Sequence, residues 1–113
     1  MSLAVHLSAP KCPHCGHAPE GYSRNITHNL GAMAQEAGIY EACWRPEEIG
    51  IKKAAQLIEP LQAGIALMKA DPARFKKFSA KNGWGLYEHF LPWLEAYLAA
   101  CKATPEADVS VSR

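Results

Sequence analysis

Two cysteines near the N-terminus have the spacing that most directly suggests chemistry. Cys12 and Cys15 stand two residues apart in the run CPHCG. Two thiolates at this spacing can reach one tetrahedral zinc ion, and backbone amides of the turn can stabilise the sulfur charges. Pro13 stiffens the turn, and Gly16 permits a left-handed conformation just after the second thiol. The pattern predicts a zinc knuckle. Two free thiols on a loop, or a redox pair, are the alternatives.

A tetrahedral zinc site needs two further ligands, and the sequence offers several. His28 is the first candidate because it follows the predicted N-cap of a helix. His17 is the second because it lies close to the knuckle, and Cys43 is the third. A site with three protein ligands would hold water in the fourth position, and zinc-bound water is a nucleophile near neutral pH. The expected cofactor is therefore zinc, in a closed structural site or an open hydrolytic one.

Polar residues crowd the start of the same predicted helix, where Asn25, Thr27 and Asn29 flank His28. One interpretation is helix capping, in which Thr27 accepts hydrogen bonds from backbone amides and Asn25 forms a turn. The other is a small ligand or anion site built from His28, Asn29 and unpaired amides at a helix N-terminus. Both interpretations place these side chains together at one point of the fold.

Two later loops pair a tryptophan with polar or permissive residues. Trp44 and Arg45 lie in the run WRPEE, and Trp84 lies in the run NGWG. An arginine in such a loop can bind a carboxylate or a phosphate, although a surface pair of Arg45 with Glu47 or Glu48 is an equal alternative. We add Trp44, Arg45 and Trp84 to the candidates for ligand binding.

The middle of the chain is basic. Residues 51–81 contain seven Lys and Arg but only two acidic residues, whereas the whole chain has a net charge of +1. The densest part, residues 74–81, resembles a patch for single-stranded nucleic acid in composition, because basic and aromatic residues alternate there. We prefer a solvated basic face over buried Phe residues. The candidate contacts are Arg74, Lys76, Lys77 and Lys81.

Hydrophobic spacing predicts helices over most of the chain and short strands at its ends. The expected strands cover residues 1–10, 21–26 and 108–112, and the last can pair with the first two. The expected helices run from Thr27 to a stop at Gly38, from Pro46, from Ile51 with a kink or break at Pro60, from Asp71, and over residues 86–104 with a bend at Pro92. The apolar helical patterns include Cys43 and Cys101, which we expect to be buried as small hydrophobic residues.

The predicted fold class is mainly α: a small helical domain of about four helices, two of them kinked at proline, with an N-terminal element of zinc knuckle and short strands. We expect one domain over residues 1–113. It would consist of the knuckle and short strands (1–26), a helical core (27–104) and a C-terminal tail or strand (105–113).

The N-terminus lacks the basic start and apolar stretch of a signal peptide, and no run approaches the ~18 apolar residues of a membrane span. We therefore expect a cytoplasmic protein without a membrane partner.

Four motifs together resemble a family of small proteins from phages and bacteria. They are CPHCG from residue 12, NITHNL from residue 25, WRPEE from residue 44 and NGWG from residue 82. The resemblance covers most of the chain and implies a phage or prophage origin, hence a bacterial host or a phage-infected cell. It implies no activity, because no function is known for such proteins.

The sequence favours a small zinc-binding accessory or interaction module that recognises a protein or a small ligand near the start of the first helix. A metal-dependent hydrolase with an open zinc site is the first alternative. A nucleic-acid-binding module using residues 74–81 is the second. A catalytic Ser-His-Asp order, a phosphate loop and a dinucleotide fingerprint are all missing, so an enzyme is the less favoured interpretation.

Overall fold

A computed structural model of the chain describes residues 2–8, 22–79 and 85–112. Of these residues, 61% are helical and 20% lie in strands. In order, the elements are β1 (Ser2–Ser8), β2 (Tyr22–Thr27), η1 (His28–Leu30), α1 (Gly31–Glu36), α2 (Tyr40–Trp44), η2 (Pro46–Ile49), α3 (Ala55–Ala70), α4 (Pro72–Lys76), α5 (Tyr87–Ala103) and β3 (Asp108–Ser112). The fold is a small α+β domain, so the prediction of a mainly α class is wrong.

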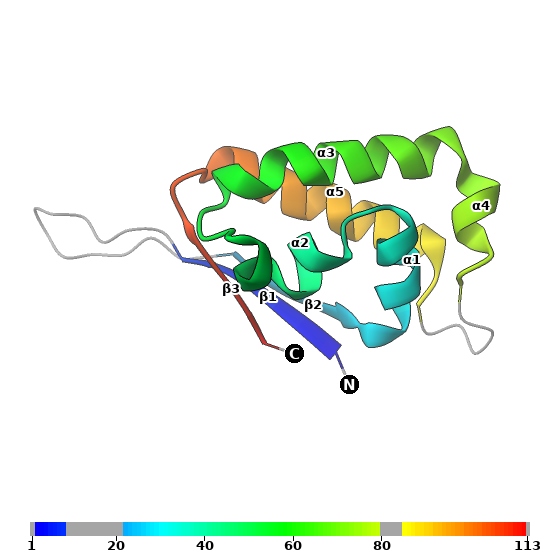
Figure 1. The fold of residues 1–113 in the computed structure, drawn as a ribbon, viewed down its shortest axis with the longest axis horizontal. Coiled ribbons are helices and arrows are strands. Elements are labelled where there is room, and N and C mark those ends of the chain that lie inside the picture. The colour runs from blue at the N-terminus through cyan, green and yellow to red at the C-terminus, as the bar shows by residue number, and fades with distance from the viewer. Residues whose placement is uncertain (1, 9–21, 80–84, 113) are drawn as a thin grey trace, which may run out of the picture.

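The sheet is the reason for this correction. Its three antiparallel strands have the order β2-β1-β3, so the last strand of the chain lies beside the first (Figure 1). Alternate residues of β1 point into the core, where Leu3, Val5 and Leu7 are at most 2% exposed. The three expected strands are confirmed, including the addition of the C-terminal one. They form one wall of the core rather than an appendage to a knuckle.

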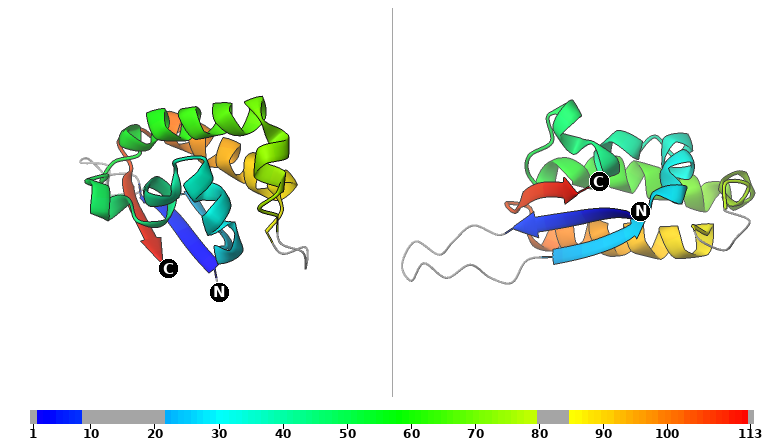
Figure 2. Two further views of the ribbon diagram at one scale, coloured as in Figure 1. Left: turned by 45° about the vertical axis from the view of Figure 1, so that its right-hand side comes forward. Right: turned by 90° about the horizontal axis from the view of Figure 1, so that it is seen from below.

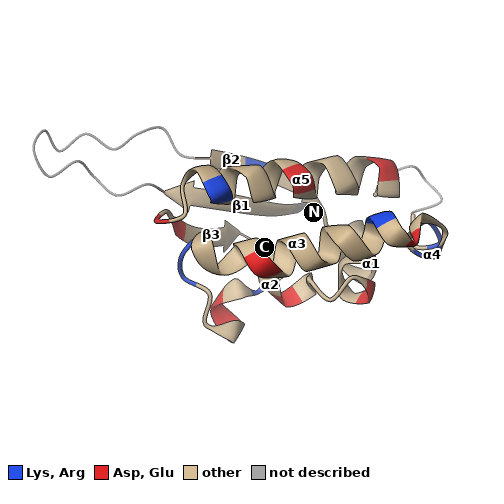
Figure 3. Cartoon of the chain, turned by 90° about the horizontal axis from the view of Figure 1, so that it is seen from above, with Lys and Arg blue, Asp and Glu red and all other residues tan. Residues whose placement is uncertain are grey.

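The helices lie on one face of this sheet. Views from the front, from below and from above show α3 and α5 side by side and antiparallel, and no helix of the described residues lies on the opposite face of the sheet (Figures 1, 2 and 3). Both helices contribute large apolar side chains to the same hydrophobic core as β1. The core residues Leu57, Leu61, Phe90, Leu94 and Tyr97 are all 0% exposed.

Two prolines lie inside these helices without ending them. Pro60 lies within α3 and Pro92 lies within α5, and each helix continues past its proline. The break that the sequence allowed at Pro60 does not occur. A proline inside a helix removes one backbone hydrogen bond. Pro60 is half-buried and Pro92 is exposed, which places both away from the fully buried core positions. The predicted stop at Gly38 is confirmed by its φ of 77°.

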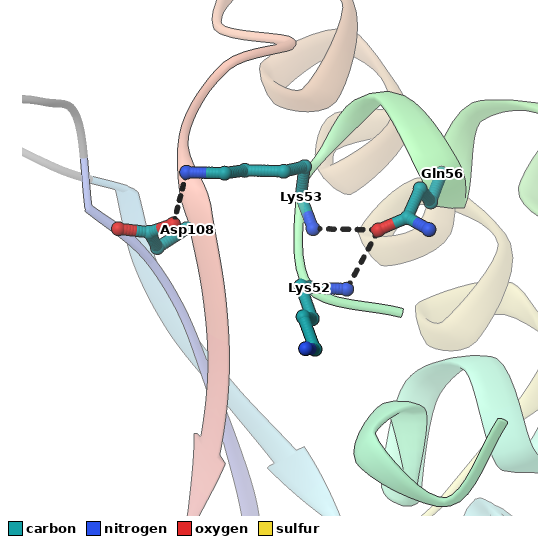
Figure 4. A network of polar contacts seen from close by, with 4 residues as sticks. All are labelled: Lys52, Lys53, Gln56 and Asp108. Atoms are coloured by element: carbon teal, nitrogen blue, oxygen red, sulfur yellow. Dashed lines mark hydrogen bonds and ion pairs between the residues drawn. The ribbon is translucent and has the colours of Figure 1, made fainter. Parts of the chain in front are cut away.

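The start of α3 is fastened to the last strand (Figure 4). The side chain of Gln56 turns back, and its Oε1 accepts hydrogen bonds from the amides of Lys52 at 2.7 Å and Lys53 at 2.9 Å. The ammonium group of Lys53 forms an ion pair with Asp108 on β3. The amide of Val109 donates to the carbonyl of Lys52 at 2.9 Å. These contacts hold the helical layer against the edge of the sheet.

None of the helices in residues 2–8, 22–79 and 85–112 combines the length and the apolar character that crossing a membrane requires.

Candidate functional site

A surface pocket of about 430 Å³ opens between α1 and α2. Its volume falls within the range of ~300–1,000 Å³ that is typical of small-molecule sites. Three of its lining residues, His28, Trp44 and Arg45, are candidates from the sequence. Among the residues that the structure describes, the lining consists of His28, Gly31, Ala32, Gln35, Tyr40, Trp44 and Arg45.

The polar helix start positions His28. The hydroxyl of Thr27 accepts a hydrogen bond from the amide of Asn29 at 3.3 Å, as expected for a cap. Leu30 is only 1% exposed and anchors the end of η1 in the core. His28 lies two residues before this buried anchor. Its side chain is half-buried and lines the pocket.

A tight reversal brings α2 back to this helix start. Gly38 adopts the left-handed conformation that glycine tolerates best. The amide of Ile39 then donates to the carbonyl of Ala34 at 2.9 Å, and the Ile39 side chain is 1% exposed. Since α2 begins at the next residue, Tyr40 and Trp44 lie beside α1.

The hydrogen bond between Trp44 and His28 determines the protonation pattern of the imidazole. The indole Nε1–H donates to Nδ1 of His28 at 2.9 Å. An indole nitrogen can only donate, so Nδ1 must accept. The neutral ring of His28 therefore carries its proton on Nε2 and presents a hydrogen-bond donor there.

Two stacked aromatic rings form the flat part of the lining. The rings of Tyr40 and Trp44 lie 5.6 Å apart between centroids, with 13° between their planes. Trp44 is 3% exposed, whereas Tyr40 is half-buried, so Tyr40 provides the accessible ring. A Cβ added to Gly31 would lie 3.5 Å from Cε2 of Tyr40, which shows how closely this ring approaches the start of α1.

Arg45 supplies the positive charge of the pocket. Its Nη1 donates to Oε2 of Glu48 at 2.7 Å, which is one of the surface pairs that the sequence allowed. The hydrogen bond to Glu48, and then contact with the Tyr40 hydroxyl, raise the pKa of Arg45 above its ordinary value. The guanidinium therefore stays charged and is held in position at the pocket.

The other candidates for ligand binding lie elsewhere. Asn25 is opposite Ala4 in the sheet and is exposed. Thr27 and Asn29 form the cap of η1 and are not part of the lining. Trp84 lies outside the described residues. The structure thus brings together His28, Trp44 and Arg45 but not the whole polar cluster.

The predicted zinc ligands Cys12, Cys15 and His17 lie outside the described residues. For His28, the arrangement leaves no free lone pair on the neutral ring, because Nδ1 accepts from Trp44 and Nε2 carries the proton. A metal ion could bind His28 only after that hydrogen bond is broken. Among residues 2–8, 22–79 and 85–112, no cluster of three or more His, Cys, Asp or Glu side chains is placed to hold a metal.

Cys43, the third choice of zinc ligand, is 0% exposed, as is Cys101. Burial, with a smaller contribution from Cys101, raises the pKa of the Cys43 thiol from 9.0 to about 12. Zinc binds thiolates, so a protonated thiol in the core is a poor ligand. The prediction that both cysteines are buried hydrophobic residues is confirmed.

The basic segment makes contacts within the protein. Arg74 forms an ion pair with Glu36, and its guanidinium lies 5.4 Å from the ring centre of Phe75. Phe75 is 0% exposed and is therefore not accessible for stacking on a base. The ammonium group of Lys76 lies 5.7 Å from the ring centre of Tyr87. The remaining candidates are Lys77, which is exposed, and Lys81, which lies outside the described residues.

Reasoning from the sequence missed four of the described lining residues, namely Gly31, Ala32, Gln35 and Tyr40. For Tyr40 a signal was present, because residues four apart share one face of a helix and Tyr40 precedes Trp44 by four. No signal of this kind marked Gln35. It lines the pocket because α2 folds back on α1, which cannot be predicted from Gln35 itself.

The chain was compared with protein families, curated proteins and solved structures. No family model, no curated protein and no solved structure matches it. The resemblance to small phage and bacterial proteins stays a prediction.

Proposed function

We propose that the protein is a small binding module whose ligand site is the pocket between α1 and α2. One observation carries the proposal: His28 from η1 meets Tyr40, Trp44 and Arg45, which lie in or directly after α2, around one opening. A pocket with an aromatic surface and a few convergent polar groups is the usual form of a small-molecule site. The site lies at the start of the first helix, where the sequence predicted recognition.

The predicted zinc knuckle is a second part of this proposal. In this proposal the zinc ion is bound by Cys12 and Cys15 and has a structural role, which would make the protein an accessory module rather than a hydrolase. Paired cysteines that hold a metal suit a reducing compartment, so we propose a cytoplasmic location in a bacterial host or a phage-infected cell.

The pocket can be tested with a fragment screen. Two-dimensional amide spectra of ¹⁵N-labelled protein would be recorded with small molecules of mixed charge. We expect the hits to shift signals of Gly31, Ala32, Tyr40 and the Trp44 indole. Ala32 is an exposed lining residue, so Ala32→Trp should fill the opening without burying the new ring and should abolish these shifts.

Ala73→Trp is the matched control, because Ala73 is also an exposed alanine in a short helix, α4, but does not line the pocket. It should leave the shifts unchanged. Hits that gather at another surface, or that persist in Ala32→Trp, would contradict the proposed site.

A further inference from the structure

We propose that the ligand of this pocket is a small carboxylate attached to a flat, apolar ring. This inference rests on the proposed function and narrows the class of ligand. It depends on the charges and hydrogen-bonding groups of the lining and on the shape of the surface that Tyr40 provides.

The described lining favours an anion. It contains one permanent positive charge, on Arg45, and no carboxylate. His28 adds an Nε2–H donor, because its Nδ1 accepts from Trp44. The acidic residues Glu41, Glu47 and Glu48 are exposed and are not part of the lining, although Glu48 forms an ion pair with Arg45. A carboxylate can accept hydrogen bonds from both a guanidinium and an imidazole N–H.

Arg45 has the donors for such a ligand although it already pairs with Glu48. A guanidinium has five N–H donors in a fixed plane. The hydrogen bond from Nη1 to Glu48 uses one of them, and the guanidinium also contacts the Tyr40 hydroxyl, which leaves further donors for a ligand. The Arg45 and Glu48 side chains are 42% and 51% exposed, so a ligand can approach the pair. Glu48 then both orients the guanidinium and competes with the ligand for its charge.

The flat ring of the ligand follows from Tyr40. Its ring is stacked on the buried Trp44 and lies close to Gly31, and these two contacts restrict its movement. An aromatic ring gains from offset stacking on such a surface, beyond the area that it buries. A ligand with a planar apolar part next to its carboxylate can contact Tyr40 and Arg45 at the same time.

Three probes of similar size separate the requirement for a carboxylate from the requirement for a flat ring. They are benzoate, benzamide and cyclohexanecarboxylate. Each would be titrated into ¹⁵N-labelled full-length protein at constant ionic strength. We expect benzoate to bind at the pocket about tenfold or more tightly than benzamide, which lacks the charge. Cyclohexanecarboxylate should bind more weakly than benzoate, because its ring cannot stack.

Variants of the charge pair sharpen the test. Arg45→Gln should weaken benzoate about tenfold or more and leave benzamide nearly unchanged. Glu48→Gln should tighten benzoate severalfold, because it removes the competing carboxylate. Arg24→Gln is the matched control: Arg24 is an exposed arginine on β2, away from the pocket lining, and its loss should change neither affinity.

The outcomes separate this inference from the proposed function. If benzamide binds at the pocket as tightly as benzoate, the carboxylate class is wrong and the pocket remains a ligand site. If cyclohexanecarboxylate equals benzoate, the requirement for a flat ring is wrong. If no probe shifts the lining residues and the fragment screen also gives no hits there, both proposals are overturned.

Discussion

The indole Nε1–H of Trp44 donates a hydrogen bond to Nδ1 of His28 at 2.9 Å. This bond joins α2 to the polar start of the first helical segment, and it is part-buried. The bond selects which nitrogen of the imidazole carries the proton. The pocket therefore presents a donor at Nε2, and a metal ion at His28 has to compete with an indole N–H.

The tautomer of His28 is the first prediction. Long-range ¹H–¹⁵N correlation spectra recorded above the titration range of the histidines should show His28 with its proton on Nε2. In Trp44→Phe the indole donor is lost while an aromatic ring remains, so His28 should become a mixture of both tautomers. His89, an exposed residue of α5, should be unaffected by the substitution. A neutral His28 with its proton on Nδ1 in the wild type would contradict the hydrogen bond.

Gly64 gives a prediction on stability. An alanine in a helix is ordinarily more stable than a glycine by about 1 kcal/mol. In α3, however, a Cβ added to Gly64 would lie 2.5 Å from Cγ2 of Ile39, which is only 1% exposed. We expect Gly64→Ala to lower the free energy of unfolding by about 1–3 kcal/mol, because the core is overpacked. Equilibrium unfolding in urea measures this change.

A double variant tests the cause of that loss. Ile39→Ala removes the side chain that the new methyl group meets, and alone it leaves a cavity. In Ile39→Ala combined with Gly64→Ala, the methyl group occupies part of this cavity, so the cost should be smaller than the sum of the two single costs. Strict additivity would show that the two residues do not meet. A Gly64→Ala variant as stable as the wild type would also refute the close contact.

Stability at alkaline pH follows from the buried thiol of Cys43, whose pKa is raised from 9.0 to about 12 by burial and, to a smaller extent, by Cys101. Above pH 9 the unfolded chain loses this proton while the folded chain keeps it, so the unfolded state binds fewer protons. The free energy of unfolding should therefore be unaffected by this group below pH 9 and fall as the pH rises toward 12. The slope is at most about 1.4 kcal/mol per pH unit.

Urea unfolding at several pH values from 8 to 11 measures that slope. Cys43→Ala should reduce the slope without abolishing it, because burial also raises the pKa of the Cys101 thiol to about 12 and Cys101 still contributes. Leu57→Ala is a suitable control, because Leu57 is equally buried and the substitution destabilises the core without removing a thiol. Its slope should match that of the wild type. Equal slopes in Cys43→Ala and the wild type would argue against any role of this thiol.

The local elements of the fold could be predicted from the sequence, whereas the class could not. Leu3, Val5 and Leu7 alternate as a strand requires, and the N-cap at Thr27 and the stop at Gly38 are local signals. Pairing of β1 with β3 joins opposite ends of the chain, with Val5 opposite Val111. No local pattern indicates that the paired strands form one side of the hydrophobic core. The sequence therefore predicted a mainly α class instead of an α+β class.

The same distinction applies to the candidate site. Residue type and spacing were sufficient to select His28, Trp44 and Arg45. Their meeting depends on how α2 folds back after Gly38, which also places Tyr40 against Gly31. The hydrogen bond of Trp44 to His28 spans 16 residues, and neither residue by itself predicts the other as its partner.

The zinc knuckle gives the last prediction. Plasma mass spectrometry of the purified protein should find about one zinc per chain, as expected for a single tetrahedral site. Cys12→Ser and Cys15→Ser should each lose the metal and lower the melting temperature, because binding of a structural zinc ion contributes directly to folding. A chelator should lower the melting temperature of the wild type and have no effect on either variant. Cys101→Ala should keep its zinc, since Cys101 is a buried thiol within α5.

The absence of metal from the wild type, with unchanged melting in both serine variants, would refute the knuckle. His28→Ala then addresses the ligand set. We expect it to keep zinc, because the neutral His28 ring uses Nδ1 to accept from Trp44 and carries its proton on Nε2. Loss of zinc from His28→Ala would mean that the metal displaces the indole hydrogen bond. A metal ion at Nδ1 would leave the Nε2–H donor in the pocket and benzoate binding unchanged, whereas a metal ion at Nε2 would remove this donor and weaken benzoate.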